Sequence, residues 1–256
     1  MEWFGRRARD LPWRRTNDPY AIWVSEIMLQ QTQVKTVLPY WERWMAALPT
    51  IKALAKADQR TIHKLWEGLG YYTRVRNMQR AAQMIMQQHG GKFPRRFEDV
   101  LALPGIGRYT AGAICSIAFQ QAKPILDGNV IRVLARVFGI SGDPKGREVN
   151  RKLWGLAEKL VEHASRKPGA LNQALMELGA LVCAAKNPRC GICPIAGNCF
   201  AFKRKRVEEF PQRSERPAAV RRVFHAFVWK RRGRFLVRQR RAGVVNSHLW
   251  EFQMRK

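Results

Sequence analysis

Apolar and polar residues follow a helical period along most of the chain, from about Asp18 to Cys199. Apolar residues recur three and four positions apart, which is typical of helices with one buried face, and short connections with glycine or proline separate the segments. Asp18-Pro19 predicts a helix start, because aspartate caps a helix and proline suits its first turn. The expected helices span residues 18–34, 61–66, 74–88, 97–102, 108–119, 129–138, 147–163 and 170–183.

The pattern changes after the last cysteine. Residues 202–217 are charged and contain prolines, which predicts a linker. Residues 223–228 and 234–238 alternate or run apolar around Arg232-Gly233, which predicts a β-hairpin. We therefore expect a helical domain over residues 1–201, a linker over 202–220 and a separate segment over 221–256.

Composition adds a class of partner. The 256 residues carry 47 Lys and Arg against 19 Asp and Glu, a formal net charge of +28. Such an excess predicts a polyanionic partner, namely DNA, RNA or an acidic membrane surface. No run approaches the roughly 18 apolar residues of a membrane span, and residues 1–13 are charged and aromatic, unlike a secretory leader. We therefore expect a soluble protein in a reducing compartment, without a membrane partner.

Four of the five cysteines lie in one short run: Cys183, Cys190, Cys193 and Cys199. Six residues separate the first pair, two the second and five the third. Thiolates at this spacing can converge on a zinc ion or an iron–sulfur cluster, and the single CxxC pair favours the cluster. Two disulfides or four unrelated buried thiols are the alternatives, although an odd cysteine count in a reducing compartment disfavours disulfides. Cys115, in an apolar run, is expected in the core.

The sequence LPGIG, residues 103–107, lies between two expected helices. Gly105 and Gly107 permit a tight hairpin and close backbone approach. The next helix, beginning at Arg108, offers free N–H groups at the positive end of its dipole, which predicts an anion site. On so basic a chain the anion is expected to be a DNA phosphate. An ordinary link between two helices is the alternative.

Several segments carry a family resemblance. LPGIGRYTAGAI (residues 103–114), LDGNVIRVLAR (residues 126–136) and the cysteine run together resemble the helix–hairpin–helix DNA glycosylases of the endonuclease III superfamily. SEIMLQQTQV (residues 25–34) and GLGYYTRVRN (residues 68–77) are similar to the adenine glycosylases of the MutY type. The resemblance covers about residues 11–200. It implies a mainly α, two-lobed fold with DNA in the cleft, and one [4Fe–4S] cluster per chain on the four cysteines.

Two carboxylates fit the chemistry that this resemblance implies. Release of a purine needs a protonated base and a stabilised sugar cation, which one carboxylic acid and one carboxylate supply. Glu26 lies in an apolar helical segment, where burial would raise its pKa, although the pattern alone also suits a solvent-facing or arginine-paired glutamate. The resemblance makes Glu26 the general acid that protonates adenine. It makes Asp127, which also stands at an expected N-cap, the carboxylate that stabilises the oxocarbenium-like sugar.

Two further positions refine the expected reaction. Asn129 matches the family residue that helps to position the attacking water. Tyr109 stands where bifunctional relatives carry a lysine that attacks the sugar and opens the strand through a Schiff base. Because no lysine lies within this motif, the resemblance implies a monofunctional glycosylase without strand cleavage.

DNA recognition requires that the target base leave the duplex and that side chains fill the gap. Gln31 and Tyr71 or Tyr72 match the family's intercalating and gap-filling residues. Trp13, Arg14 and Gln173 match its adenine pocket, although they also suit a core residue, a phosphate contact and a helix surface, respectively. The residues expected to contact phosphate are Arg74, Arg76, Arg108 and Lys123.

The tail departs from the family pattern. Residues 223–252, including NSHLWEF (residues 246–252), look like the opening of the Nudix-like α/β domain that reads 8-oxoguanine, and we expect it to be incomplete. A lone hairpin is not stable by itself, so it docks on the helical domain or belongs to a fragment. Discrimination of 8-oxoguanine is the property that this shortening puts most in doubt.

The sequence thus predicts a base excision repair enzyme that hydrolyses the N-glycosidic bond of adenine opposite 8-oxoguanine or guanine in double-stranded DNA. We expect a monomer in a bacterial cytoplasm, associated with the nucleoid through DNA. A thymine or uracil mismatch glycosylase is an alternative, since tyrosine at position 109 also occurs there. A non-catalytic iron–sulfur DNA-binding remnant is a second alternative, but it would not need both Glu26 and Asp127.

Overall fold

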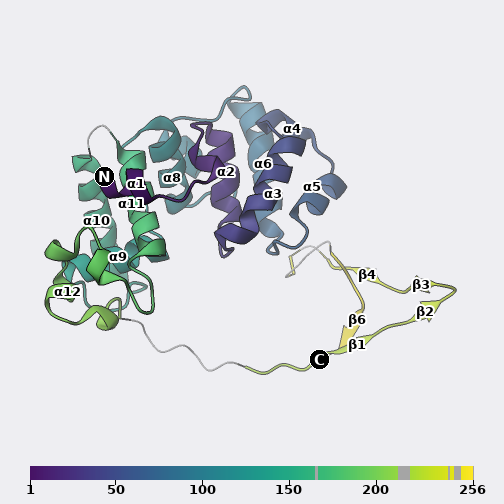
Figure 1. Cartoon of the computed structure of the whole chain (residues 1–256). Helices are drawn as coiled ribbons and strands as arrows, with labels where there is room; N and C mark the ends of the chain where they lie inside the picture. Colours follow the sequence, from purple (N-terminus) through teal and green to yellow (C-terminus); the bar gives the residue numbers. More distant parts are fainter. Residues whose placement is uncertain (165–166, 213–219, 242, 245–248, 256) are drawn as a thin grey trace.

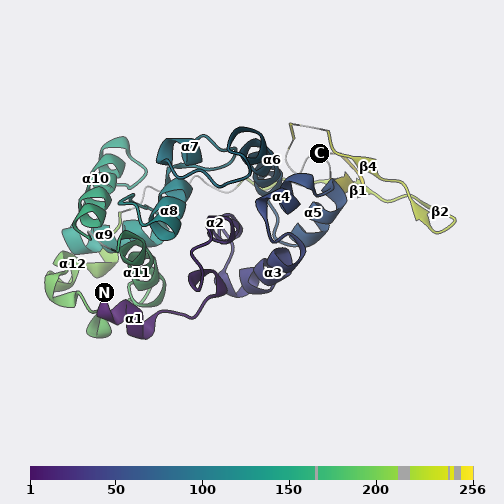
Figure 2. The same cartoon turned by 90° about the horizontal axis from the view of Figure 1, so that it is seen from above.

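The computed structural model describes residues 1–164, 167–212, 220–241, 243–244 and 249–255. These residues form twelve α-helices, four short 3-10 helices and six short strands. Two groups of helices lie side by side with α2, α7 and α8 between them, as Figures 1 and 2 show. The expected mainly helical, two-lobed fold is confirmed.

The first group contains α3 (Val34–Ala47), α4 (Ile51–Lys56), α5 (Gln59–Trp66) and α6 (Thr73–Gln88). The second contains α1 (Glu2–Arg7), α9 (Gly128–Phe138), α10 (Arg147–His163), α11 (Pro168–Leu181) and α12 (Phe200–Lys203). Between them lie α2 (Pro19–Met28), α7 (Phe97–Leu101) and α8 (Arg108–Phe119). The 3-10 helices are η1 (Pro12–Arg14), η2 (Cys190–Ile192), η3 (Ala196–Asn198) and η4 (Val207–Glu209).

The first expected helix is shorter than predicted. It begins as expected, with the Asp18 side chain accepting a hydrogen bond from the Tyr20 N–H at 3.0 Å, but α2 ends at Met28 rather than residue 34. Gln31 adopts a left-handed backbone with φ 57° and so interrupts the helix. A separate helix, α3, then follows and was not predicted, because Pro39 lies inside it and only Val37 and Trp44 are fully buried.

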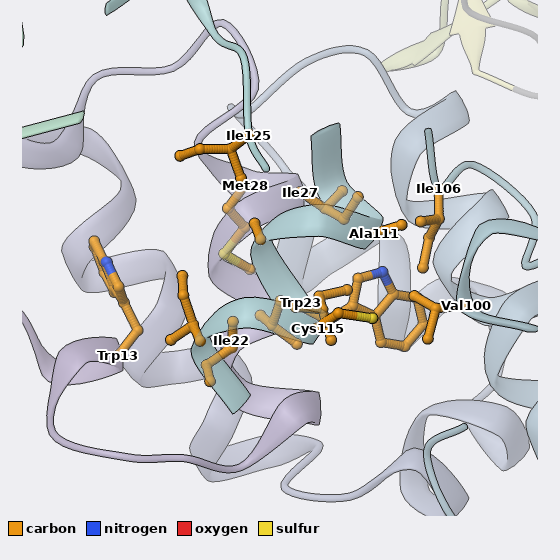
Figure 3. Close-up of a cluster of buried hydrophobic side chains, with 14 of the residues drawn as sticks. Trp13, Ile22, Trp23, Ile27, Met28, Val100, Ile106, Ala111, Cys115 and Ile125 are labelled. Carbon is orange, nitrogen blue, oxygen red and sulfur yellow. The ribbon is translucent and has the colours of Figure 1, made fainter. Parts of the chain in front are cut away.

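The seam between the two groups is the packing of α2 on α8. Every residue of α2 from Tyr20 to Met28 is buried, and α8 meets it with small residues that permit close approach. Figure 3 shows Ile22, Trp23, Ile27 and Met28 of α2 in one buried cluster with Ala111 and Cys115 of α8. This packing places the polar residues of both helices at a common edge, where the candidate site lies.

The C-terminal region contains three two-stranded antiparallel sheets. They pair β1 (His225–Phe227) with β6 (Gln253–Arg255), β2 (Lys230–Arg231) with β3 (Arg234–Phe235), and β4 (Arg238–Gln239) with β5 (Trp250–Glu251). Arg232 and Gly233 form the predicted hairpin turn, with φ values of 48° and 74°. Figure 1 shows this hairpin extending away from the helices. A Nudix-like α/β fold is not confirmed in the part of this region that the structure describes.

The segment expected as a linker begins inside folded structure. Phe210 is buried, and its carbonyl and that of Val207 accept hydrogen bonds from the Arg136 Nε at 3.0 and 3.1 Å. The remainder of this segment, residues 213–219, lies outside the described residues, as does Asn246-Ser247-His248 of the NSHLWEF motif. Among the described residues, no helix is both long and apolar enough to cross a bilayer.

Candidate active site and iron–sulfur centre

A cavity of about 650 Å³ lies at the edge of the α2–α8 seam and is also lined by the N-terminal segment, the start of α9 and α11. It brings together residues that are far apart in the sequence. The predicted site residues on its wall are Trp13, Arg14, Glu26, Gln31, Tyr109, Asp127, Asn129 and Gln173. All four predicted catalytic residues and all three predicted pocket residues therefore line one cavity.

Glu26 is held on the buried side of this cavity. Its side chain projects from α2, and the residue is 6 % exposed. Tyr109 of α8 donates a hydrogen bond from its hydroxyl to the Glu26 Oε2 at 2.8 Å, and the same hydroxyl lies 3.3 Å from the Met176 Sδ. Burial raises the pKa of Glu26 to about 7, only partly opposed by the Tyr109 bond, and the nearby Asp127 adds to the increase. The carboxyl can therefore hold a proton near neutral pH.

Asp127 is the N-cap of α9, as the sequence predicts. Its Oδ1 accepts hydrogen bonds from the N–H groups of Asn129 at 3.1 Å and Val130 at 2.8 Å, while its Oδ2 accepts from the Asn129 Nδ2 at 2.9 Å. Burial raises the pKa of Asp127, but these donors and the nearby Arg132 favour the charged form. The helix start thus fixes the carboxylate and opposes its protonation.

Arg132, which was not predicted, links this helix start to the cysteine loop. Its guanidinium donates to the Asn129 Oδ1 at 2.8 Å and to the Gly179 carbonyl of α11 at 2.7 Å. Its Nε also donates to the Cys183 carbonyl at 2.6 Å. Gly179 is required for this approach of α9 and α11, because a Cβ there would lie 2.6 Å from the Cβ of Asn129. The orientation of Asn129 therefore depends on contacts with α11 and with the start of the cysteine loop.

Glu177 of α11 also lines the cavity and is buried. This residue was not predicted. It accepts hydrogen bonds from the Arg9 Nε at 2.9 Å, the Arg9 Nη2 at 2.7 Å, the Arg9 backbone N–H at 2.8 Å and the Arg14 Nη2 at 2.8 Å. Burial opposes its charge, but these bonds outweigh burial and lower the pKa of Glu177 to about 2. Arg14 is thus held in the cavity wall by an ion pair. A single glutamate in an apolar helical segment was the available signal, but Glu177 lies outside the motifs whose family resemblance identified Glu26.

Trp13 and Gln173 complete the wall on this side. Trp13 is 6 % exposed and packs its ring against Trp41 with an edge-to-face geometry. It therefore belongs to the core and to the cavity at once, so the two interpretations of this residue do not exclude each other. Gln173 is half-buried on α11 and lines the same cavity.

Of the residues expected to enter DNA, Gln31 lines this cavity, whereas Tyr71 and Tyr72 lie outside its lining. Gln31 is exposed with φ 57°, and Tyr71 is 61 % exposed with φ 48°. Tyr72 is half-buried and packs against His63 at a ring separation of 5.7 Å. Of the two tyrosines, the structure therefore exposes only Tyr71 to a partner.

The basic residues expected at phosphate differ in what they contact. The Arg74 guanidinium donates hydrogen bonds to main-chain carbonyl groups at the end of α2, in the loop after it and in the loop before α6. Arg108 lies over the Trp154 ring at 4.0 Å and forms an ion pair with Glu158 at 3.7 Å. The Lys123 Nζ lies 4.8 Å from the Phe97 ring centre. Phosphate contacts by Arg74, Arg76, Arg108 and Lys123 remain predictions.

The LPGIG segment forms a tight connection between α7 and α8. Gly105 has φ 79°, and a Cβ at this position would lie 2.7 Å from the Asn77 Cβ, so glycine is required on both counts. Gly107 is the N-cap of α8 and provides no side chain to cap it. No side chain therefore caps the first N–H groups of α8, and anion binding there remains a prediction.

The four clustered cysteines line one small apolar cavity between α9, α11, η2 and η3. None of them forms a disulfide. Burial and the neighbouring cysteines raise the pKa of Cys190 and Cys193, so four thiolates require a cationic centre to be stable together. The described residues contain no group of three or more His, Cys, Asp or Glu side chains that could hold a single metal ion. Four sulfur ligands in an apolar cavity are the donor set of an iron–sulfur cluster.

A buried arginine supports the same conclusion. Arg136 of α9 is 2 % exposed, and its Nη1 lies 3.4 Å from the Cys183 Sγ and 2.7 Å from the Ala184 carbonyl. Among the described residues its hydrogen-bond acceptors are this sulfur and backbone carbonyls, with no carboxylate. A buried guanidinium needs a compensating charge. Four thiolates on an iron–sulfur core supply one, so the surroundings of the cysteines fit the cluster.

Two family models match the chain. One, described as "HhH-GPD superfamily base excision DNA repair protein", matches residues 24–159, and the other, described as "Iron-sulfur binding domain of endonuclease III", matches residues 183–199. The chain belongs to the HhH-GPD superfamily of base excision DNA repair proteins. Its cysteine loop is an iron–sulfur binding domain, which confirms the expected [4Fe–4S] cofactor over zinc and over disulfides.

Curated relatives carry the name adenine DNA glycosylase. The human protein is 49 % identical over 218 residues, which cover 82 % of this chain and 39 % of the relative. A Buchnera aphidicola protein is 38 % identical over 253 residues, which cover 98 % of this chain and 72 % of the relative. The chain thus spans about two fifths of the length of the human, rat and mouse proteins that it matches.

Solved structures share the fold. A thermostable thymine-DNA glycosylase superposes with a TM-score of 0.71 at 29 % identity, covering 79 % of this chain and 93 % of the other. A non-covalent complex of endonuclease III with DNA superposes with a TM-score of 0.64 at 20 % identity, covering 80 % of this chain and 93 % of the other. These likenesses confirm the two-lobed glycosylase fold.

Proposed function

We propose that this protein is a monofunctional DNA glycosylase that hydrolyses the N-glycosidic bond of adenine mispaired with 8-oxoguanine or guanine in double-stranded DNA. The observation that carries the proposal is the pairing, within one cavity, of a buried Glu26 carboxyl whose pKa is about 7 with an Asp127 carboxylate held by three donors. The names of the curated relatives support adenine as the base.

In the proposed reaction Glu26 donates its proton to a ring nitrogen of adenine that has been flipped into the cavity. The bond between that base and the sugar C1′ then breaks, and its electron pair leaves with the base. General acid catalysis of this kind contributes about 10²- to 10⁴-fold to a rate. Water forms the new bond to C1′, and the proton that it loses restores Glu26. The products are free adenine and an abasic site.

Asp127 faces the positive charge that develops on the sugar. A fixed carboxylate stabilises such a charge without reorganising during the reaction. Its three donors favour the charged form of Asp127 and oppose the rise in pKa that burial causes, while the neighbouring Glu26 carries the proton. Two carboxyl groups in one cavity thus take different roles because their partners differ. Asn129, which is bonded to both Asp127 and Arg132, is a positioning residue for the carboxylate and the water.

Tyr109 supports hydrolysis without strand cleavage. A lysine at this position would attack C1′ and form a Schiff base, whereas the Tyr109 hydroxyl is committed to Glu26. Burial raises the pKa of Tyr109 well above its ordinary value, so the hydroxyl stays protonated and donates.

DNA binding follows from charge and from the LPGIG segment in this proposal. The excess of 28 positive charges supports phosphate binding. Gly105, Gly107 and the free N–H groups of α8 provide a specific phosphate contact. Cys183, Cys190, Cys193 and Cys199 hold the cluster, which fixes the loop against α9 when it is bound. We propose that the protein binds DNA as a monomer in a bacterial cytoplasm. A Buchnera aphidicola relative that aligns with 98 % of the chain supports the bacterial location.

A single-turnover assay with a labelled strand tests the proposal. Adenine is placed opposite 8-oxoguanine, guanine or thymine, and a duplex with thymine opposite guanine serves as the test of the alternative base. We expect alkali-dependent cleavage at adenine, fastest opposite 8-oxoguanine or guanine. Cleavage without alkali would contradict the monofunctional assignment.

Two other outcomes would replace the proposal. Release of thymine in place of adenine would make the protein a thymine mismatch glycosylase, the alternative that the structural likeness to such an enzyme favours. Tight DNA binding without base release from any duplex, with the cluster intact, would indicate a non-catalytic DNA-binding protein. The Asp127→Asn variant checks the mechanism, since it should bind the mismatch but release adenine slower by about 10²-fold or more.

A further inference from the structure

Arg74, the second residue of α6, holds two loops that are distant in the sequence. Its Nη1 donates to the carbonyl groups of Ile27 at 2.9 Å, Met28 at 3.3 Å and Gln30 at 2.6 Å. Its Nη2 donates to the carbonyl groups of Leu69 at 3.0 Å and Gly70 at 3.2 Å. One planar guanidinium thus caps the C-terminal end of α2 and, at the same time, fixes the loop that leads into α6.

The Arg74 side chain is itself fixed from two sides. Its guanidinium carbon lies 5.2 Å from the Trp66 ring centre and 5.5 Å from the Tyr71 ring centre. Such contacts are favourable for a guanidinium, and Trp66 is fully buried. The arginine therefore has little freedom to turn toward a DNA phosphate. Its charge serves contacts within the protein.

Each of the two loops carries one exposed residue in a left-handed conformation. Gln31 follows the carbonyl of Gln30, and Tyr71 follows the carbonyl of Gly70; Arg74 binds both of these carbonyls. Residues other than glycine rarely adopt this backbone conformation, and they keep it where the surroundings fix it. Arg74 contacts both loops, so the same side chain fixes the conformation of each.

Another residue of α6 contacts the LPGIG segment, a third loop beside the two that contain Gln31 and Tyr71. Asn77, one helical turn after Arg74, packs against Gly105 of the LPGIG segment. Together these groups line a cleft of about 250 Å³ beside the catalytic cavity, and its wall includes Gln30, Gln31, Tyr71, Arg74, Asn77 and Gly105. The start of α6 is therefore where the elements proposed to enter or grip DNA meet.

We infer that Arg74 is a positioning residue that joins Gln31 and Tyr71 into one preformed wedge, so that both enter the duplex together when adenine leaves it. The inference rests on the proposed function. Order that exists before binding does not have to be created during binding, which favours the distorted DNA complex. Loss of Arg74 is expected to impair base flipping while leaving binding to undistorted DNA nearly intact.

We call the hydrogen bonds from Arg74 to the loops at residues 29–32 and 69–72 the clamp. Hydrogen–deuterium exchange on the unbound full chain tests this clamp without any assumption about activity. Arg74→Lys keeps the charge and the stem but loses the planar fork that reaches both loops. We expect exchange of the amides in residues 29–32 and 69–72 to become faster by about tenfold or more, with α8 unchanged. Arg80→Lys is the matched control, since Arg80 is exposed on the same helix. Unchanged exchange in both loops of Arg74→Lys would overturn the clamp.

A cycle of variants tests whether Arg74 acts through the wedge. Arg74→Ala is expected to slow single-turnover release of adenine opposite 8-oxoguanine by about ten- to a hundred-fold. In a Gln31→Ala/Tyr71→Ala background the same substitution should cost less than about twofold, because the residues it positions are already absent. Losses that simply multiply would show general damage to the fold and overturn the inference.

The two experiments separate the possible failures. If Arg74→Ala does not fold, Arg74→Lys replaces it in the cycle with the same expected direction. If the unmodified protein releases no adenine, the proposed function fails, while the exchange measurement still decides whether Arg74 orders both loops. Fluorescence of 2-aminopurine placed at the target position provides the direct readout of flipping. It should rise with the unmodified protein and much less with Arg74→Ala.

Discussion

Glu26 and Glu177 line the same cavity and both are buried, yet they ionise in opposite ways. Burial raises the pKa of Glu26 to about 7, because its closest partner is the neutral hydroxyl of Tyr109. Burial opposes the charge of Glu177 as well, but Arg9 and Arg14 outweigh it and lower the pKa to about 2. Of these two glutamates, one can therefore transfer a proton near neutral pH and the other stays charged. The charged partners of Glu177 outweigh burial, whereas the neutral partner of Glu26 does not.

The two glutamates also depend on different parts of the chain. Glu26 and Tyr109 are fixed by the α2–α8 seam, which belongs to the deepest part of the core. Glu177 instead binds the N-terminal segment, where Arg9 and Arg14 lie 168 and 163 positions away in the sequence. The first pair is expected to serve the reaction, and the second to hold the wall that carries Trp13 and Arg14. Variants of Glu26 should therefore lose activity, whereas variants of Glu177 should lose stability.

The largest effect is expected from Glu26→Gln. It removes the proton donor but keeps the size of the side chain, so release of adenine should slow by about 10²- to 10⁴-fold at neutral pH. Binding of mismatched DNA should change little. Single-turnover rates and gel-shift affinities on the same protein sample provide the measurement. A rate within a few-fold of the unmodified protein would remove Glu26 from the proposed chemistry.

Glu177→Gln should instead act mainly on stability. It leaves Arg9 and Arg14 facing a neutral amide, and we expect unfolding to become easier by about 2–3 kcal/mol, because Arg9 remains partly solvated. Chemical denaturation followed by circular dichroism measures this change, and the visible absorbance of the cluster shows that the loop is intact. Asp10→Asn in the same segment is the control, since the ion pair between Asp10 and Arg15 is exposed. An equal loss of unfolding free energy in both variants would contradict the proposed structural role of Glu177.

The pH dependence of stability should separate the two glutamates further. The raised pKa of Glu26 means that the folded state holds its proton more tightly than the unfolded state. This contribution is complete below about pH 4.5 and is lost as the pH rises through about 7. Glu177 has the opposite sign: its contribution is present above pH 4.5 and is lost as the pH falls toward 2.

Midpoints of thermal unfolding at pH 5 and pH 8 measure this difference. The midpoint of Glu26→Gln, taken relative to that of the unmodified protein at the same pH, should be higher at pH 8 than at pH 5, because the amide avoids a buried charge. The deficit of Glu177→Gln should be nearly the same at both values, since Glu177 is ionised throughout. A deficit of Glu177→Gln that disappears between pH 8 and pH 5 would contradict its lowered pKa.

The comparison also shows how far the sequence reaches. Glu26, Asp127 and the cysteines could be predicted because each lies in a short contiguous motif whose local pattern carries its role. Glu177 has the same local signal as Glu26, a lone acid among apolar helical residues, but its partners come from the other end of the chain. No spacing rule reports a contact of that range. The sequence therefore indicates a buried acid without indicating its charge.

The fold shows a similar limit. The ends of α8 and α10 were predicted correctly, because the helical period is strong and glycine precedes each helix. The boundary between α2 and α3 was missed, since Gln31 leaves the helix without any glycine or proline to indicate it. Arg74, whose residue type suggested a phosphate contact, donates hydrogen bonds to carbonyl groups at that boundary, which the sequence did not indicate. A basic side chain indicates charge, whereas its partners depend on the tertiary structure.

The smallest effect in this series is expected from Tyr109→Phe. The Tyr109 hydroxyl donates to the Glu26 Oε2 at 2.8 Å and thereby lowers the pKa that burial raises. Without this bond the pKa of Glu26 should rise further, so the carboxyl stays protonated to higher pH. The alkaline limb of the rate profile should move upward, while the rate at neutral pH changes by less than about tenfold, because the proton donor itself remains. A limb that moves to lower pH would mean that the hydroxyl stabilises the protonated carboxyl. Tyr109 would then act on Glu26 in the opposite sense to that in which Arg9 and Arg14 act on Glu177, whose charged form they stabilise.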